Sequence, residues 1–291
     1  MNRKIKLFFL PFLFILIPLL IGAAQAGAQG IGLKLYGLYG SIGDGDVYEG
    51  LKGPTDWWAQ VITLSGFART GDFKQFDNSW EAGGDLIFYF TPVLGIGLGG
   101  GYLQTLPAKT EMTFTKTANP DIHMSMNPKI TAIPVRASLY ASIPMGSALR
   151  LTLHGGASYY FTRMEFAWRL GTDSDWIQVE NKADSKGLGF HGGAGLEFNF
   201  SSSASLFVEA TGRLAKISGF TGDATMSTSG GGSATDSGTL YYWKYDYGPL
   251  GIIPEIGIRD PAPSGANYSD VREAEIDLSG FGLRAGFIFR F

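Results

Sequence analysis

Two histidines, a serine and a glutamate are the first residues whose types and spacing suggest chemistry. His154 precedes Ser158 by four residues in one alternating segment, and His191 and Glu197 belong to the next one. A histidine, a hydroxyl and a carboxylate are the groups that acyl transfer requires, with the histidine acting as base. Whether these groups can act together depends on which face of each element carries their side chains.

His123 suggests a different chemistry, because it stands between methionines in the sequence "DIHMSM". Thioether and imidazole ligands suit copper. The motif is not repeated, however, and the chain contains no cysteine to supply a thiolate or a disulfide. We therefore predict no metal site and no cofactor.

The elements that must position these groups are strands with a period of two. In the final segment, "FGLRAGFIFRF", apolar residues from Phe281 to Phe291 occupy every second place, and Arg284 and Arg290 stand between them. One face of such a strand can meet lipid while the other carries charge, as in a barrel strand of an outer membrane. Eight segments follow this pattern: 31–40, 80–90, 93–103, 129–143, 149–161, 188–200, 206–217 and 281–291.

The connections between these segments alternate in length. Short turns are expected at 91–93, 144–147 and 201–204, and long loops at 41–78, 106–128, 163–185 and 218–274. Short periplasmic turns and long outer loops are typical of outer-membrane barrels. We predict an all-β fold, a transmembrane antiparallel up-and-down β-barrel of eight strands. Ten strands is the alternative, because 241–247 and 252–258 form a further hairpin, which we place outside the membrane.

The N-terminal segment predicts export. Arg3, Lys4 and Lys6 precede an uncharged run at 7–21, and small residues follow it. This pattern is typical of a secretory signal peptide, and we favour cleavage after Ala26, with Ala28 as the alternative. The predicted domains are thus a signal peptide at 1–26 and a barrel at 27–291.

Composition supports the same interpretation. The chain has 42 glycines, 14% aromatic and 17% charged residues, which suits a glycine-rich β protein better than a soluble enzyme. Without the three basic residues of the leader, 20 basic residues face 26 acidic ones. Because this balance offers no basic patch, we expect no nucleic-acid partner.

Together, the leader, the eight alternating segments and the terminal phenylalanine resemble the small bacterial outer-membrane β-barrel family, the eight-stranded class that includes the transmembrane domain of outer-membrane protein A. The resemblance implies a monomer surrounded by outer-membrane lipid in a Gram-negative cell. It also implies that the C-terminal strand, with Phe287, Phe289 and Phe291, is the signal read by the barrel-assembly machinery. The likeness is architectural, so it does not transfer a function.

The inward positions carry a network of charged and titratable side chains. Its members are Lys34, Glu81, Asp85, Arg136, Arg150, His154, His191, Glu197, Glu209, Arg213, Arg284 and Arg290. In a barrel of eight strands the interior is just wide enough for side chains to fill it, so we expect mixed charges to pair and plug it. The glycines at 95, 97, 99 and 101 leave volume for these side chains. A narrow passive, porin-like channel for small solutes or ions is the alternative, and the arginine excess would favour anions.

Catalysis ranks lowest among the hypotheses. The two histidines, Ser158 and Glu197 all belong to inward faces, where a nucleophile cannot reach membrane lipid. We therefore predict no catalytic residues, and keep a lipid-modifying enzyme only as a lower-ranked alternative.

The outer loops are where specificity is expected. A low-complexity segment, "TMSTSGGGSATDSG", precedes Tyr241, Tyr242 and Trp243, and Trp57 and Trp58 belong to the first long loop. A flexible spacer and an aromatic cluster can present a surface to an extracellular sugar or protein. The alternative, which we favour, is that these aromatics form an interfacial girdle or pack extracellular hairpins together. The segment at 54–67 is expected to form a short helix or rim strand on the membrane surface. We predict a structural or surface-interaction role through these loops.

Overall fold

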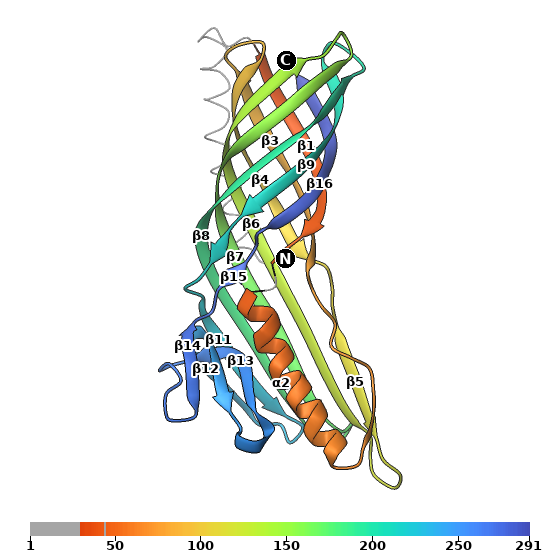
Figure 1. Cartoon of the computed structure of the whole chain (residues 1–291), viewed down its shortest axis with the longest axis vertical. Coiled ribbons are helices and arrows are strands. Elements are labelled where there is room, and N and C mark those ends of the chain that lie inside the picture. The colour runs from red at the N-terminus through yellow and green to blue at the C-terminus, as the bar shows by residue number, and fades with distance from the viewer. Residues whose placement is uncertain (1–29, 44) are drawn as a thin grey trace.

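The computed structural model describes residues 30–43 and 45–291. The predicted signal peptide and its cleavage site lie outside these residues. The described chain forms an antiparallel barrel with a folded extension at one end (Figure 1). We call this extension the head.

Eight strands pair in a closed ring, which confirms the predicted number. Each strand pairs with the next along the ring, and the last pairs with the first. The ring consists of β1 (Gly30–Ser41), β3 (Asn78–Tyr89), β4 (Leu94–Thr105), β6 (Ile122–Pro144), β7 (Leu149–Gly171), β8 (Trp176–Asn199), β9 (Ala204–Leu214) and β16 (Gly280–Arg290).

The first and last strands close the ring. The register of β1 and β16 runs from Gly32 opposite Arg290 to Gly40 opposite Gly282. Beyond it, the Phe291 amide donates a hydrogen bond of 2.9 Å to the Ile31 carbonyl. The chain therefore leaves no unpaired strand edge within the barrel.

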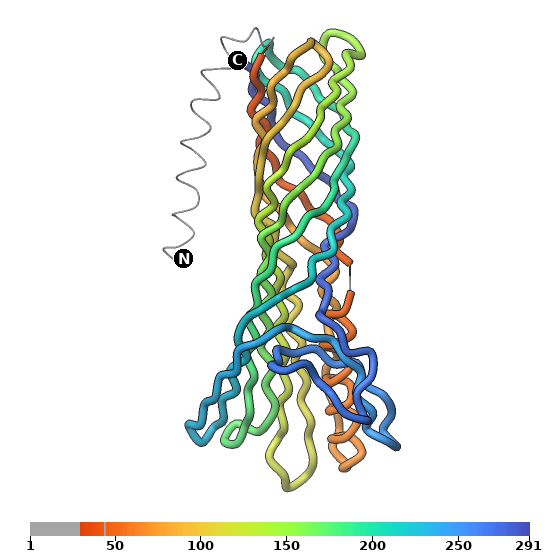
Figure 2. The backbone as a smooth tube through the Cα atoms, turned by 90° about the vertical axis from the view of Figure 1, so that its left-hand side faces the viewer, coloured from red at the N-terminus to blue at the C-terminus, as the bar shows by residue number. Residues whose placement is uncertain are grey.

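The connections obey the predicted asymmetry. The three short turns gather at one end of the barrel, near the C-terminus, and the long connections extend from the other end (Figures 1 and 2). The outward faces of the ring strands expose large apolar side chains, such as Leu139 at 66% and Leu283 at 64%. This is the surface that lipid covers in a membrane barrel.

The inward face of β4 is made of glycines, as expected. A Cβ at Gly97 would overlap the ring of Tyr140, and a Cβ at Gly99 would overlap the carboxylate of Asp85. These glycines therefore provide space for large side chains from the neighbouring strands β6 and β3.

The four long connections are folded segments, which corrects their prediction as loops. Strands β6, β7 and β8 continue far beyond the ring, and β9 ends at Leu214 rather than at 217. The remaining head elements are α2 (Gly45–Leu64), β2 (Ala68–Thr70), β5 (Thr110–Thr115), β10 (Lys216–Ile217), β11 (Thr221–Thr228), β12 (Ser233–Asp246), the 3-10 helix η1 (Gly248–Leu250), β13 (Ile252–Arg259), β14 (Tyr268–Glu273) and β15 (Ile276–Asp277).

Two predictions about the last long connection have different outcomes. The hairpin of 241–247 and 252–258 exists as β12 and β13 and lies outside the ring, as expected. The low-complexity segment is not a flexible spacer, because it forms the hairpin of β11 and β12, with Asp223 opposite Ser237. β11 also pairs with β8, and this pairing ties the hairpin to the long strands.

The apolar face of the long strands switches sides where they leave the barrel. In the barrel part of β6 the apolar residues Val135 and Leu139 point outward, whereas in the head Met126 and Ile130 point inward and are 2% exposed. β7 changes in the same way, since Phe161 is exposed and Met164 is buried. Outside the lipid the apolar side chains must pack against protein instead, so they turn towards a core.

That core fills the concave side of the extended strands and includes one face of α2. Its largest cluster contains Val47, Leu51, Met126, Ile130, Met164, Phe166, Phe220, Leu240, Tyr242, Ile256, Ile258 and Ile276, among others. The helix lies along the inner side of the head (Figure 1). The expectation that 54–67 rests on the membrane surface is therefore wrong.

Small residues bring the helix close to β13. A Cβ at Gly50 would meet the side chain of Ile256, and a Cβ at Gly53 would overlap the carbonyl of Pro254. The head therefore packs α2 directly against a strand from the last connection. Among the described helices, none is long and apolar enough to cross a membrane.

Candidate functional site: the charged barrel interior and a pocket in the head

Glu209 of β9 is the centre of one group of charges inside the barrel. Its carboxylate lies 2.5 Å from the Lys34 ammonium, 3.9 Å from Arg284 and 3.5 Å from Nε2 of His154. The Thr152 hydroxyl donates to it at 3.4 Å. Glu209 and Lys34 are each 1% exposed, so this ion pair lies in a region of low dielectric.

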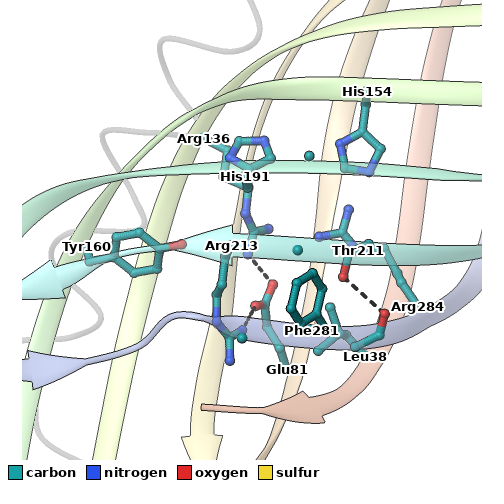
Figure 3. A pocket seen from close by; sticks show the side chains of 14 residues that line it. Leu38, Glu81, Arg136, His154, Tyr160, His191, Thr211, Arg213, Phe281 and Arg284 are labelled. Atoms are coloured by element: carbon teal, nitrogen blue, oxygen red, sulfur yellow. Dashed lines mark hydrogen bonds and ion pairs between the residues drawn. The ribbon is translucent and has the colours of Figure 1, made fainter. Parts of the chain in front are cut away.

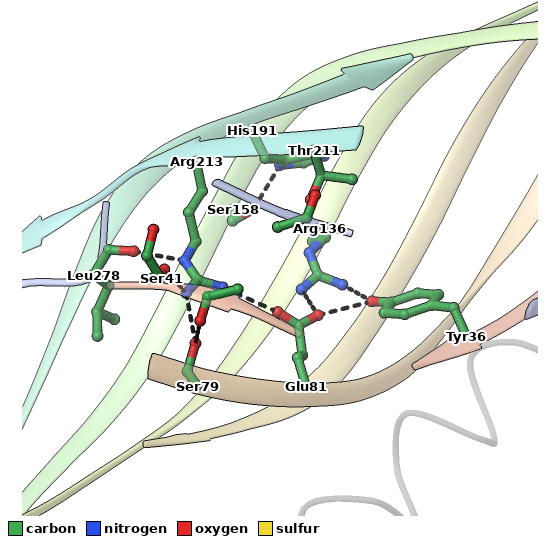
Figure 4. A network of polar contacts seen from close by, with 12 residues as sticks. Tyr36, Ser41, Ser79, Glu81, Arg136, Ser158, His191, Thr211, Arg213 and Leu278 are labelled. Atoms are coloured by element: carbon green, nitrogen blue, oxygen red, sulfur yellow. Dashed lines mark hydrogen bonds and ion pairs between the residues drawn. The ribbon is translucent and has the colours of Figure 1, made fainter. Parts of the chain in front are cut away.

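Glu81 of β3 is the centre of a second group, nearer the head (Figure 4). Its carboxylate accepts hydrogen bonds from Arg136 and, at 3.0 Å, from the Tyr36 hydroxyl. Arg213 lies 3.5 Å away. Three basic or hydroxyl groups from three other strands therefore converge on one carboxylate.

Arg213 also ties the end of the barrel to the head. Its guanidinium donates to the carbonyls of Leu278 at 2.5 Å and Ser41 at 3.1 Å, and to the Ser79 hydroxyl at 3.1 Å. These contacts join β9, β1, β3 and the segment after β15 at the point where the ring ends.

The remaining predicted residues lie towards the short turns. Glu197 lies 2.5 Å from Arg290, and Asp85 accepts a hydrogen bond of 2.8 Å from Tyr140. Arg150 donates to the Pro92 carbonyl at 2.8 Å. The network also contains hydroxyl groups that were not among the predicted site residues, namely those of Tyr36, Tyr140 and Thr152. Their positions follow the same inward alternation.

His191 contacts two hydroxyl groups and no acid among the described residues. His191 Nε2 lies 2.8 Å from the Ser138 hydroxyl, and its Nδ1 lies 2.7 Å from that of Ser158. Glu197 contacts Arg290 instead, so the suggested trio of histidine, serine and glutamate does not assemble. His123 is exposed in β6, 3.3 Å from Thr113, while its neighbours Met124 and Met126 point into the head. No group of three potential metal ligands occurs in 30–43 and 45–291.

A small cavity lies among the interior charges (Figure 3). Its volume is about 20 Å³, which is room for about one water molecule. The polar side chains around it are those of Glu81, Arg136, His154, Tyr160, His191, Thr211, Arg213 and Arg284.

The aromatic residues predicted to present a ligand surface divide into two groups. Tyr242 and Trp243 are 1% and 4% exposed, so their expected role at the surface is wrong. Tyr242 belongs to the head core. The Trp243 indole instead lies against Gly257 and Arg259 and donates a hydrogen bond of 3.0 Å to Glu255, all on β13. Tyr241 is half-buried, and Trp57 and Trp58 pack edge to face, with ring centroids 4.7 Å apart.

Trp57 belongs to the wall of an open pocket between α2 and β13. The pocket has a volume of about 290 Å³, and the indole of Trp57 stacks on Tyr247 with centroids 4.5 Å apart. The lining residues are Tyr48, Glu49, Lys52, Gly53, Asp56, Trp57, Gln60, Ile253 and Pro254. The pocket thus combines apolar walls with amide and carboxylate groups, as small-molecule sites do.

Two of the three charged side chains that line this pocket compensate each other, and the third, Glu49, is hydrogen-bonded. Lys52 pairs with Asp56 one helical turn away, and Glu49 accepts a hydrogen bond of 2.9 Å from the Tyr242 hydroxyl. Burial, followed by this hydrogen bond, raises the pKa of Tyr242 above its ordinary range. Burial and a hydrogen bond to Glu255 likewise raise the pKa of Tyr247.

The family model of the outer membrane protein β-barrel domain matches residues 12–233. The chain belongs to this family. Its location is therefore the bacterial outer membrane, and the resemblance drawn from the sequence is confirmed.

Solved structures give more distant likenesses. The outer membrane protein OprG from Pseudomonas aeruginosa is 11% identical with a TM-score of 0.39, over 91% of this chain and 97% of that chain. The outer membrane protease OmpT from Escherichia coli is 10% identical with a TM-score of 0.33, over 91% and 97%. The outer membrane protein AlkL is 10% identical with a TM-score of 0.31, over 91% of both chains. A comparison with curated proteins gives no match.

Proposed function

We propose that this outer-membrane barrel is non-enzymatic, that its interior is plugged, and that it anchors a rigid head that binds a ligand at the cell surface. The observation that carries the proposal is the core of the head, which is built from segments of the long connections. Binding surfaces gain affinity when they are held in place before the ligand arrives. A packed head offers such a surface, whereas mobile loops would lose entropy on binding.

The pairing of interior charges supports a plugged barrel. Glu81, Glu197 and Glu209 each form an ion pair with at least one basic side chain, and Asp85 is bound by Tyr140. Opening a path would separate buried charges from their partners, at a cost of several kcal/mol for each carboxylate. A monomer surrounded by lipid is sufficient to anchor the head in this way.

The pocket beside α2 is the place on the head where we propose that the ligand binds. The indole of Trp57 and the ring of Tyr48 supply apolar surface, and Gln60, Asp56 and Glu49 supply hydrogen-bonding groups. Because Lys52 neutralises Asp56, this chemistry fits an uncharged ligand with many hydroxyl groups and one apolar face. A sugar unit of a surface glycan has these properties.

Planar-bilayer recordings test the plugged interior. We expect the refolded chain, residues 27–291, to give no stable conductance steps once heat-dependent gel mobility shows that it is folded. Arg136→Gln removes a partner of Glu81 and serves as the sensitised variant. Steps in the wild type that change size in this variant would support the passive channel and reject the plug.

Glycan binding tests the head. The labelled, refolded chain is applied to an array of neutral oligosaccharides, together with Trp57→Phe and Gln60→Leu. We expect both variants to lose binding by tenfold or more, while Trp176→Phe, the same exchange at a tryptophan outside the pocket, binds like the wild type. Absence of binding to every glycan, or equal binding by all variants, would reject the proposed pocket.

A further inference from the structure

Arg284 carries a buried charge that has no hydrogen bond to any residue the structure describes. Its side chain is 4% exposed, and the nearest carboxylate oxygen, Oε2 of Glu209, is 3.9 Å away. The guanidinium stacks on the ring of Tyr36, 4.1 Å from the ring centroid. Its Nε is a buried donor without an acceptor in 30–43 and 45–291. A charged group buried in this way is costly unless something accepts its hydrogen bonds.

The charge balance of the interior also indicates that a negative charge is missing beside Arg284. Six basic residues of the network face four acidic ones when the histidines are counted as neutral. Glu209 is already held by Lys34 at 2.5 Å, and Glu81 is shared by Arg136 and Arg213. Among the interior bases that form an ion pair, Arg284 has the longest distance to its carboxylate, 3.9 Å. One negative charge beside it would reduce the excess of positive charge.

The cavity among the interior charges lies where that charge is needed. Arg284, Arg136 and Arg213 all line it, as do His154 and His191 (Figure 3). The Nε2 atom of His154 lies 3.5 Å from the Glu209 carboxylate, so its N–H points to that acid. Three arginines and one carboxylate, that of Glu81, thus line a space of about 20 Å³, so positive charge predominates there.

We propose that this cavity binds one small monovalent anion of the halide class, held by the Arg284 guanidinium and attracted by Arg136 and Arg213, which line the same cavity. Its size admits a single atom about as large as a water molecule, which excludes phosphate, sulfate and organic acids. The anion is a structural counter-ion that locks the interior network. The site is separate from the head pocket and does not depend on it.

Crystallography of the refolded wild-type chain in bromide provides the direct test. We expect an anomalous peak in the cavity, within contact distance of Arg284. The same crystal form of Arg284→Gln should lose this peak. Arg150→Gln should keep it, because Arg150 binds the Pro92 carbonyl and does not line the cavity. Density that fits only water, or a peak unaffected by Arg284→Gln, would overturn the site.

Stability in solution provides an independent readout. A ligand that binds only the folded state raises the unfolding midpoint. Above the dissociation constant, this rise grows with the logarithm of the ligand concentration. At constant ionic strength, we expect chloride or bromide to raise the midpoint of the wild type and of Arg150→Gln relative to gluconate. The rise should disappear in Arg284→Gln and in Arg284→Lys. Equal shifts in all four proteins would indicate an adventitious surface ion only.

Discussion

Lys34 on β1 and Glu209 on β9 form an ion pair of 2.5 Å across the barrel interior. The two residues are 175 positions apart, and each is 1% exposed. The pair therefore links the first and the seventh strands of the ring in a buried region where charges are poorly hydrated.

Removing the acid of this pair should destabilise the barrel strongly. Glu209→Leu leaves Lys34 and Arg284 buried without a carboxylate, and we expect a loss of about 3 to 5 kcal/mol in the free energy of unfolding. The double variant Lys34→Met with Glu209→Leu should lose less, because fewer unpaired charges remain. Urea unfolding in lipid vesicles measures both. A double variant as unstable as Glu209→Leu alone would contradict this account.

The glycines of β4 should tolerate no side chain. A Cβ at Gly99 would overlap the Asp85 carboxylate, so Gly99→Ala should cost about 1 to 3 kcal/mol through overpacking. Gly37 is the matched control, since a Cβ there meets no atom within 4 Å. Folding yield and urea midpoints of the two alanine variants should differ clearly, and equal values would show that the interior can rearrange around residue 99.

The head should unfold separately when its helix loses an apolar anchor. Leu51 is 2% exposed within the head core, and Leu51→Ala should cost about 2 to 5 kcal/mol. Leu64→Ala, at a position 71% exposed on the same helix, should have little effect. Limited proteolysis should cut the head of Leu51→Ala faster, while heat-dependent gel mobility still reports a folded barrel. Equal cleavage of both variants would mean that α2 is not needed for the core.

The head should lose stability at high pH. Burial and acceptor carboxylates raise the pKa of Tyr242 and Tyr247 in the folded state. Their contribution is complete below the unfolded tyrosine pKa of about 10, and it falls as the pH rises towards the folded value. Proteolysis of the head measured from pH 8 to pH 11 should therefore accelerate above about 10.

Substitution of one of these tyrosines identifies the cause. Tyr247→Phe should flatten the pH dependence, because it removes a hydroxyl that donates to Glu255 at 2.5 Å. Tyr241→Phe is the control, since the Tyr241 hydroxyl forms no hydrogen bond in the part of the chain that the structure describes. A pH profile that is unchanged in Tyr247→Phe would assign the effect to other groups.

The C-terminal residue should affect assembly more than stability. Phe291 is 81% exposed, and only its backbone pairs with Ile31. We propose that the assembly machinery reads the aromatic side chains of the last strand. On this proposal, we expect Phe291→Ala to refold in detergent like the wild type but to reach the outer membrane in several-fold smaller amounts. Equal amounts in cells would remove the proposed recognition of Phe287, Phe289 and Phe291.

The junction of barrel and head is visible in the sequence as a change in which alternate positions are apolar. The strand bounds predicted from the sequence do not take this change into account. In β6 the alternating apolar residues change from even positions, such as Met126 and Ile130, to odd ones, such as Val135 and Leu139. If apolar side chains could face only lipid, such a switch from even to odd positions would mark the end of a strand. The strand continues, and its apolar face turns from lipid to a protein core.

The sequence by itself determined the ring of eight strands, the lipid-facing side of each strand and the inward position of the charged residues. It could do so because these properties depend on a period of two within short segments and on the bilayer as a uniform solvent. The tertiary structure decided which charges meet and what the long connections become. The pairing of Lys34 with Glu209 depends on ring closure, and the burial of Tyr242 beneath α2 depends on contacts between distant segments. No local pattern encodes such long-range contacts.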